Sequence, residues 1–158
     1  MTRKHIKKCL FFYSLFFGVF APIFVQTCQA LEYRSVAIAK AVMLDGPSAN
    51  ANKLYIVSLG YPVEVIVNLG DWLKVRDPQG GLNWLETKAL SPKRTVLVTV
   101  NHADIRQSAD ADSGLLANVD KDVVLDLLET NAKNGWLKVR HRDGITGYIL
   151  NTSVWGAN

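Results

Sequence analysis

The pentapeptide Trp-Leu-Lys-Val-Arg occurs at residues 72–76 and again, unchanged, at residues 136–140. The correspondence continues without a gap at the same offset of 64, which pairs Gly80 with Gly144. Similarity at a fixed spacing indicates copies of one structural unit. The sequence therefore predicts two units of about 55 to 60 residues each, which together account for the chain after residue 30.

Upstream of the pentapeptide the offset changes. Residues 41–43 match residues 103–105 at an offset of 62. The next match pairs an alternating apolar run with its counterpart at an offset of 60: Val63, Val65 and Val67 with Val123, Leu125 and Leu127. Each change falls in a stretch of turn-forming residues, where insertions are tolerated.

Within each unit the apolar pattern has a period of two and is interrupted by turn signals, which indicates strands. Residues 115–128 could also form a helix, but the matching residues 54–67 contain Gly60 and Pro62, which a helix interior does not tolerate. We therefore expect strands in both units. The pattern predicts an all-β chain of two tandem small barrels with about five short strands each.

Residues 1–30 have the order of a secretory signal. Basic residues lie within residues 1–8, an uncharged apolar run of 17 residues covers Cys9–Val25, and small or polar residues lead to Ala30. This order predicts export and cleavage near Ala30. Two alternatives stay open: an uncleaved N-terminal anchor, because the run approaches the length of a membrane-spanning helix, and lipidation at Cys28.

The basic character of the chain comes from this leader. The whole chain has 18 Lys and Arg against 14 Asp and Glu, but four of the bases lie in residues 1–30, so the remainder is balanced. Nucleic-acid binding, which needs clustered excess base, is therefore not expected. Contact with a membrane is expected only through an uncleaved leader.

The remainder of the chain lacks the groups that catalysis needs. Both cysteines, Cys9 and Cys28, lie in the leader, and His102 and His141 occupy non-equivalent positions of the repeat. No recognised catalytic motif is present. We therefore expect no enzymatic activity, no metal site and no cofactor.

Each unit contains the same sequence features in the same order. They are an opening strand with a turn, a valine-rich strand, a Gly or Asp before Trp-x-x-Val, and a glycine before an aromatic closing strand. In this chain these features are Met43–Ser48, Val63–Val67, Asp71–Val75 and Gly80–Leu85, then Ile105–Ser108, Val123–Leu127, Gly135–Val139 and Gly147–Ile149. Each unit therefore resembles the bacterial SH3-like domain (SH3b), and the resemblance implies two SH3-like barrels, residues 31–91 and 92–158, behind a signal over residues 1–30.

Candidate binding residues follow from the alternation along the repeated strand. Leu73 and Val75 fall on one face and the larger polar residues on the other, where the resemblance places a ligand groove. The candidate groove residues are Trp72, Lys74, Arg76, Trp136, Lys138 and Arg140, joined by Trp84 and Tyr148 of the closing strands. The loops Ser48–Lys53 and Ser108–Gly114 are positioned like the groove-forming loop of SH3 folds.

The resulting hypothesis is an exported, periplasmic or secreted module of the cell envelope. It would bind a peptide, a peptidoglycan stem or a protein partner through its SH3-like grooves. A tryptophan beside cations suits a ligand with an apolar part and a carboxylate. The alternative is a structural or assembly adaptor whose Trp faces are buried between the domains or in a homodimer.

Overall fold

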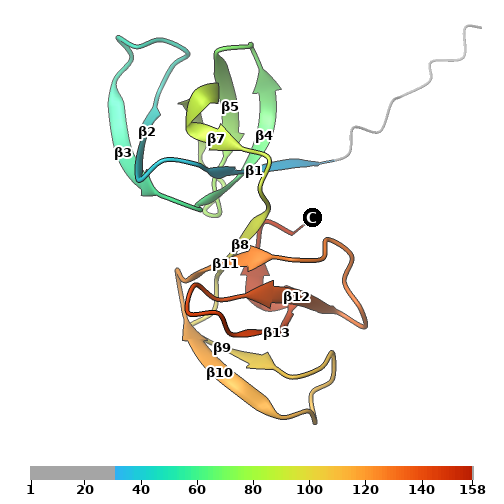
Figure 1. The fold of residues 1–158 in the computed structure, drawn as a ribbon. Helices are drawn as coiled ribbons and strands as arrows, with labels where there is room; N and C mark the ends of the chain where they lie inside the picture. The colour runs from blue at the N-terminus through green and yellow to red at the C-terminus, as the bar shows by residue number, and fades with distance from the viewer. Residues whose placement is uncertain (1–30, 158) are drawn as a thin grey trace, which may run out of the picture.

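The computed structural model describes residues 31–157, so the predicted secretory signal over residues 1–30 lies outside the described residues. The described chain forms two units with the same order of elements (Figure 1). The first consists of β1 (Glu32–Val36), β2 (Lys40–Leu44), β3 (Lys53–Ser58), β4 (Pro62–Asn68), β5 (Trp72–Arg76), β6 (Leu82–Glu86), the 3-10 helix η1 (Thr87–Ala89) and β7 (Leu90–Ser91). The second consists of β8 (Thr95–Val98), β9 (His102–Arg106), β10 (Leu115–Asp120), β11 (Val124–Leu127), β12 (Trp136–Arg140), β13 (Thr146–Leu150), η2 (Asn151–Ser153) and β14 (Val154–Trp155).

The two sheets have the same topology. Their strand orders are β3-β2-β6-β5-β4-β1-β7 and β10-β9-β13-β12-β11-β8-β14, and the pairs that join neighbouring strands are antiparallel. The predicted all-β fold of two tandem barrels is confirmed. Each unit has seven strands rather than about five, because the fold adds an opening strand and a two-residue closing strand. Within residues 31–157 no helix has the length and apolar character needed to cross a membrane.

The period of two along the repeated strand is confirmed by burial. Leu73 and Val75 are fully buried, and so are Leu137 and Val139 in the second unit. Strand formation over residues 115–128 is also confirmed, since β10 and β11 occupy this stretch. Each unit has its own hydrophobic core. The alternation thus places one face of each central strand in the core of its unit and the other at the surface.

The strand register corrects one detail of the repeat. Glu64 lies opposite Arg76 in the first unit, and Asp126 lies opposite Arg140 in the second. The offset from β4 to β11 is therefore 62, not 60, and the fully buried Val63 corresponds to the fully buried Leu125. A shift of two residues keeps every side chain on its face, so the apolar pattern alone could not distinguish the two alignments.

One offset of 62 consequently holds from the opening strand to the end of β4 and β11, and it becomes 64 after the following turn. The tight turns before these strands agree with it: Gly60 has φ +81° and Asp122, its counterpart, has φ +66°. The backbone N–H of each donates to the carbonyl of an equivalent residue, Val36 or Val98. Two units with a single two-residue length difference therefore share one backbone design.

The two units meet through a small polar contact. Ser35 Oγ lies 2.7 Å from both the Lys93 carbonyl oxygen and Thr95 Oγ1. Thr95 Oγ1 in turn donates to the Gly60 carbonyl oxygen at 2.6 Å. Ser35 and Thr95 are buried, so these hydroxyls satisfy backbone oxygens that water does not reach. The contact joins the first strand of one unit to the first strand of the other.

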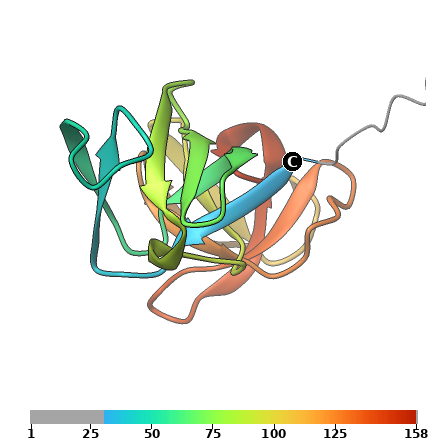
Figure 2. The same cartoon turned by 90° about the horizontal axis from the view of Figure 1, so that it is seen from above.

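Aromatic and basic side chains complete this junction. The rings of Tyr33 and Trp155 pack edge to face, with centroids 5.3 Å apart, and the Arg94 guanidinium lies 5.1 Å from the centroid of Tyr33. Arg94 Nη2 donates to the carbonyl oxygens of Gly156 and Ala157 at 2.9 and 2.6 Å. The end of the chain consequently lies between the units (Figure 1), which overlap when seen from above (Figure 2).

Candidate functional site

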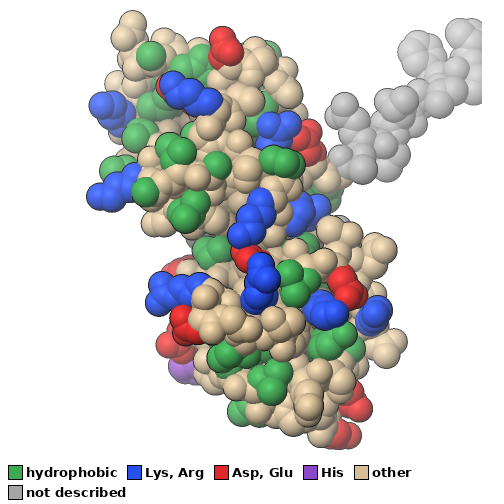
Figure 3. Space-filling view, viewed as in Figure 1, with side chains coloured by type: hydrophobic (Ala, Val, Ile, Leu, Met, Phe, Trp, Pro, Cys, Tyr) green, Lys and Arg blue, Asp and Glu red, His purple; other side chains and the backbone are tan. Residues whose placement is uncertain are grey.

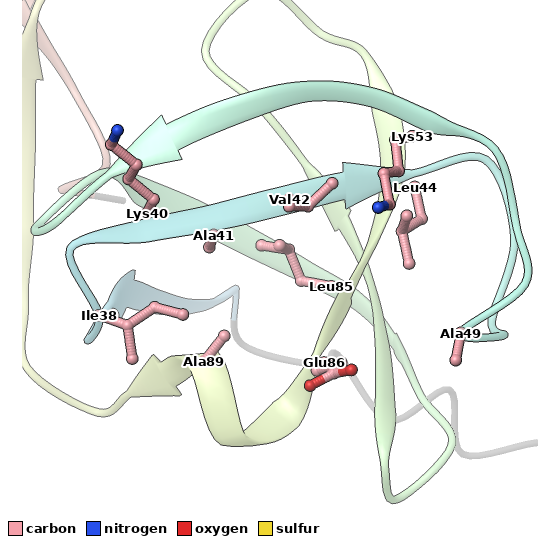
Figure 4. Close-up of a pocket in the computed structure, with 10 residues that line it drawn as sticks. All are labelled: Ile38, Lys40, Ala41, Val42, Leu44, Ala49, Lys53, Leu85, Glu86 and Ala89. Atoms are coloured by element: carbon pink, nitrogen blue, oxygen red, sulfur yellow. The ribbon is translucent and has the colours of Figure 1, made fainter.

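The first unit has a groove between β2 and the segment that runs from β6 into η1 (Figure 4). Its volume is about 240 Å³. The buried side chains of Ala41, Leu85 and Ala89 line its apolar centre, and Lys40 and Lys53 stand at opposite ends (Figure 4). The other lining residues are Ile38, Val42, Leu44, Ala49 and Glu86.

The second unit has a groove of about 460 Å³ at the equivalent place. Most lining positions correspond through the offsets of 62 and 64, as Lys40 with His102, Ala41 with Ala103, Val42 with Asp104, Leu44 with Arg106, Ala49 with Ala111, Glu86 with Leu150, and Ala89 with Ser153. Asn118 and Trp136 complete it. Because both units have the groove although their lining side chains differ, the groove follows from the backbone fold that the two units share.

The second groove is the more polar of the two. Its Asp104 accepts hydrogen bonds from Arg106 at 2.8 Å and from Asn118 at 3.0 Å. His102 lies 2.8 Å from a carboxylate oxygen of Asp120. The charged groups of this groove therefore bond to one another, whereas the centre of the first groove is aliphatic.

In the first unit the predicted binding residues lie beside the groove rather than in it. Trp72 is half-buried and lines a separate hollow of about 300 Å³ with Asp71, Glu86, Thr87 and Lys88. Glu86 lines both hollows, so they adjoin. Lys74 lies across from Trp84 on the neighbouring strand, with its Nζ 6.0 Å from the centre of the Trp84 ring. These residues form a surface next to the groove.

In the second unit Trp136 lines the groove, but it is only 7% exposed. Lys138 lies opposite Tyr148 and donates to Glu129 at 3.1 Å. This hydrogen bond raises the pKa of Lys138. The repeated Trp thus differs between the units in burial, and the repeated Lys differs in its partners.

The sequence matches the model of a known family over most of both units. The model of the bacterial SH3 domain covers residues 38–92 and residues 99–156. The chain belongs to the bacterial SH3 domain family. The resemblance inferred from the repeated motifs is therefore confirmed. No curated protein sequence matches the chain.

Several solved structures are similar to this SH3 tandem. NlpC2 from Trichomonas vaginalis has 17% sequence identity over 80% of this chain and 48% of its own, with a TM-score of 0.36. NlpC1 from the same organism has 16% identity over 82% of this chain and 47% of its own, with a TM-score of 0.37. A structure titled "Endolysin LysPBC5 CBD" has 15% identity over 85% of this chain and all of its own, with a TM-score of 0.32. The chain spans about half the length of the two NlpC structures.

The repeated arginines of the two SH3 units are held by acids. Arg76 Nη1 donates to Glu64 at 2.9 Å, and Arg140 Nη2 donates to Asp126 at 3.2 Å. Glu64 is buried, and removing its cation would leave a buried charge without a partner. Each pair joins β4 to β5 or β11 to β12, so Arg76 and Arg140 contribute to the structure of the sheets in addition to any part in binding.

A second polar cluster, in the first SH3 unit, fixes the turn after β5. Asp77 is buried and accepts from the backbone N–H groups of Gln79 and Gly81 through one oxygen, and from the Tyr55 hydroxyl and Asn83 amide through the other. Burial, together with the hydrogen bond and charge of Asp77, raises the pKa of Tyr55 well above its usual value. Tyr55 thus stays a neutral donor that ties β3 to this turn.

Sequence reasoning missed the residues of β2 and of the β6–η1 segment that line the grooves. It did identify the loops, since Ala49, Lys53 and Ala111 lie in the predicted groove-forming segments. A signal was available, because the offset of 62 found for residues 41–43 aligns Lys40–Leu44 with His102–Arg106. The groove lies between strands that are not consecutive along the chain, however, so finding it requires the strand order, which the alternation does not contain.

Proposed function

We propose that this chain is an exported module of the cell envelope that binds a peptide, a peptidoglycan stem or a protein partner through the grooves of its SH3 units. It acts without catalysis of its own. The observation that carries the proposal is the recurrence of one groove, at equivalent positions of both units, between β2 and the β6–η1 segment or their counterparts. A hollow with an apolar centre that recurs at the same place of both units is the surface best suited to a ligand.

The shape of the grooves favours a short, extended ligand. Their volumes of about 240 and 460 Å³ suit a few residues rather than a whole protein surface. The first groove combines an aliphatic centre with charged ends, a distribution that buries a small side chain and leaves polar groups to orient the backbone. A peptide segment fits this description, whether it belongs to a wall polymer or to a protein.

The proposed location follows from residues 1–30 and their order of basic, apolar and small residues. Cleavage near Ala30 would release the tandem to the periplasm or the exterior. An uncleaved leader would hold the same tandem at the membrane. N-terminal sequencing of the protein purified from its host distinguishes the two.

The adaptor hypothesis remains the second candidate. The junction described above consists of Tyr33, Arg94 and Trp155 with the Ser35–Thr95 contact, while Trp72 lies in a hollow of its own. Assembly through Trp72 would require a second chain to cover its partly exposed ring. Sedimentation of the tandem with and without Trp72→Ala tests this, because an adaptor that pairs through Trp72 loses its dimer in the variant.

The deciding experiment is a pull-down of residues 31–158 on purified peptidoglycan sacculi. Ile38→Ser removes an aliphatic side chain that lines the first groove. Ile66→Ser is the matched control, because the exposed fractions of Ile38 and Ile66 are similar, 44% and 37%, and Ile66 lies outside the groove. Trp72→Ala tests the adjoining surface. We expect retention of the wild type and of Ile66→Ser, with several-fold weaker retention of Ile38→Ser.

No retention of the folded wild type, with folding verified by circular dichroism, would refute binding to the wall. Equal retention of Ile38→Ser and Ile66→Ser would refute the groove as the site. Loss caused by Trp72→Ala alone would move the site to the surface predicted from the sequence.

A further inference from the structure

Three lysines of the first unit have no acidic partner. Within residues 31–157, the amino groups of Lys40, Lys53 and Lys74 take part in no ion pair and no hydrogen bond to a side chain, whereas most other cations do. Two of the three line the groove. The third lies on the adjoining surface beside Trp84. The positive charges next to this groove are therefore not compensated by the chain itself.

The second unit gives the same positions acidic partners or removes the charge. Lys40 lies opposite Ser58, but its counterpart His102 lies opposite Asp120 and bonds to it at 2.8 Å. Lys53 is replaced by Leu115. Lys74 corresponds to Lys138, which pairs with Glu129 at 3.1 Å. The difference between the units is thus systematic, because each lysine left uncompensated in the first is neutralised or absent in the second.

The acids that line the grooves are paired in both units. Glu86, the one acidic residue among those that line the first groove, pairs with Lys88 at 2.6 Å, which offsets its charge. In the second groove Asp104 pairs with Arg106 at 2.8 Å, so the arginine that lines this groove already has an acidic partner. Lys53 turns its amino group towards Val42 and Leu44 (Figure 4). A carboxylate at this end of the first groove would meet a cation beside an aliphatic surface.

We propose that the first groove is the carboxylate-binding groove of the pair and that the second groove, where His102 and Arg106 already have acidic partners, does not bind carboxylates. The occupant of the first is a short peptide with a small aliphatic side chain over Ala41 and Leu85 and a carboxylate at Lys53, with Lys40 attracting acidic groups at the other end. This inference rests on the proposed function, because it names the ligand chemistry of the same groove. The two units then have different specificities within one tandem.

The test compares two peptides that differ only in charge. Acetyl-trialanine with a free carboxylate and its C-terminal amide are titrated separately into ¹⁵N-labelled residues 31–158, and the backbone amide signals are followed. We expect the acid to shift the signals of residues 40–44 and 53 with a threefold to tenfold higher affinity than the amide, an effect of the size that one or two exposed ion pairs give. The preference should shrink at high salt.

The variants use the second unit as the template. Lys53→Leu and Ser58→Asp introduce the residues found at positions 115 and 120, and each should lower the affinity for the acid by about threefold without changing that for the amide. Lys121→Gln is the matched control, since it removes an unpaired lysine of the second unit that lies outside the groove.

Failure of this inference differs from failure of the proposed function. Equal affinities for the free-carboxylate peptide and the amide peptide would overturn the inference while leaving a peptide groove in place. The same conclusion would follow if the free-carboxylate peptide shifted the signals of residues 102–106 instead. If neither peptide binds, retention of lysine variants on peptidoglycan sacculi tests the inference instead. Weaker retention of Lys40→Gln/Lys53→Gln than of the control Lys121→Gln/Lys133→Gln supports the inference, and equal retention refutes it. Loss of wild-type retention as well would refute the proposed function.

Discussion

Replacing Arg94 should weaken both the second unit, whose last residues it binds, and the contact of that unit with the first. Arg94→Ala removes two hydrogen bonds from a cation to carbonyl oxygens, at 2.9 and 2.6 Å, and the contact with the Tyr33 ring at 5.1 Å. Charged hydrogen bonds contribute about 1.5 kcal/mol or more each, and a half-buried cation–π contact contributes about 1 kcal/mol. Because the three contributions are not fully additive, we expect the free energy of unfolding to fall by about 3 kcal/mol.

The assay is urea unfolding of residues 31–158, followed by circular dichroism and by tryptophan fluorescence. With a slope of about 2 kcal/mol per molar urea, the loss corresponds to a midpoint lower by about 1.5 M. The fluorescence is the sum of four tryptophans, and one of them, Trp155, senses the junction because its ring packs against Tyr33. We expect the two signals to coincide in the wild type and to separate in the variant, as the units begin to unfold independently.

Two further substitutions make this prediction sharp. Arg94→Lys keeps the charge but can reach fewer acceptors, so it should lose about half as much. Arg34→Ala removes only a surface ion pair with Glu32 and should cost at most about 1 kcal/mol. If Arg94→Ala unfolds within 0.5 kcal/mol of the wild type, with coincident signals, the junction does not couple the units and the reasoning is refuted.

Three other predictions concern stability. In urea unfolding, Gly156→Ala should lower the free energy of unfolding by about 3 kcal/mol and Gly80→Ala by only about 1 kcal/mol. Both glycines have positive φ, but a Cβ at Gly156 would lie 2.9 Å from the Thr95 carbonyl oxygen, whereas Gly80 faces open space. Equal losses would contradict this geometry. Asp77→Asn should cost about 2 kcal/mol, because one of the two oxygens that accept hydrogen bonds becomes a donor facing donors; an unchanged midpoint would refute the cluster. Burial opposes the charge of Asp126, but hydrogen bonds from two cations outweigh it and lower its pKa, so its contribution is present above the unfolded value near 3.8 and is lost as pH falls through the lower folded pKa. Asp126→Asn should flatten this acid limb in a series of midpoints from pH 6 to pH 2, and an identical limb would contradict the prediction.

The divergence of the two units explains why one fold holds grooves of different character. Both units keep the residues that build the backbone, such as Leu73 and Leu137 in the cores and the acid–arginine pair across the central strands. The lining side chains outside the two core clusters, such as Val42 and Leu44, are free of that constraint. Val42 and Leu44 could become Asp104 and Arg106 without disturbing either core, because Asp104 and Arg106 pair with each other.

The strands of this protein could be predicted because their determinants are local. Alternation over Trp72–Arg76 fixes which side chains are buried, and Gly60 and Pro62 exclude a helix, so a few neighbouring residues suffice. The duplication could be predicted for the same reason, since an identical pentapeptide at a spacing of 64 is visible without any structure. The fold class follows from these two observations, whereas the family was inferred from the resemblance of the turn, Trp-x-x-Val and closing-strand motifs.

The partners of the exposed residues were decided only by the tertiary structure. The alternation correctly placed Trp72, Lys74 and Arg76 on one face, but it could not reveal that Glu64 holds Arg76 or that Trp136 is buried while its counterpart is not. Groove, junction and ion pairs join residues from strands that are distant along the chain. A pattern with a period of two is unchanged by a shift of two residues, so it determines the face of each side chain and leaves its neighbour on the next strand to the register of the folded sheet.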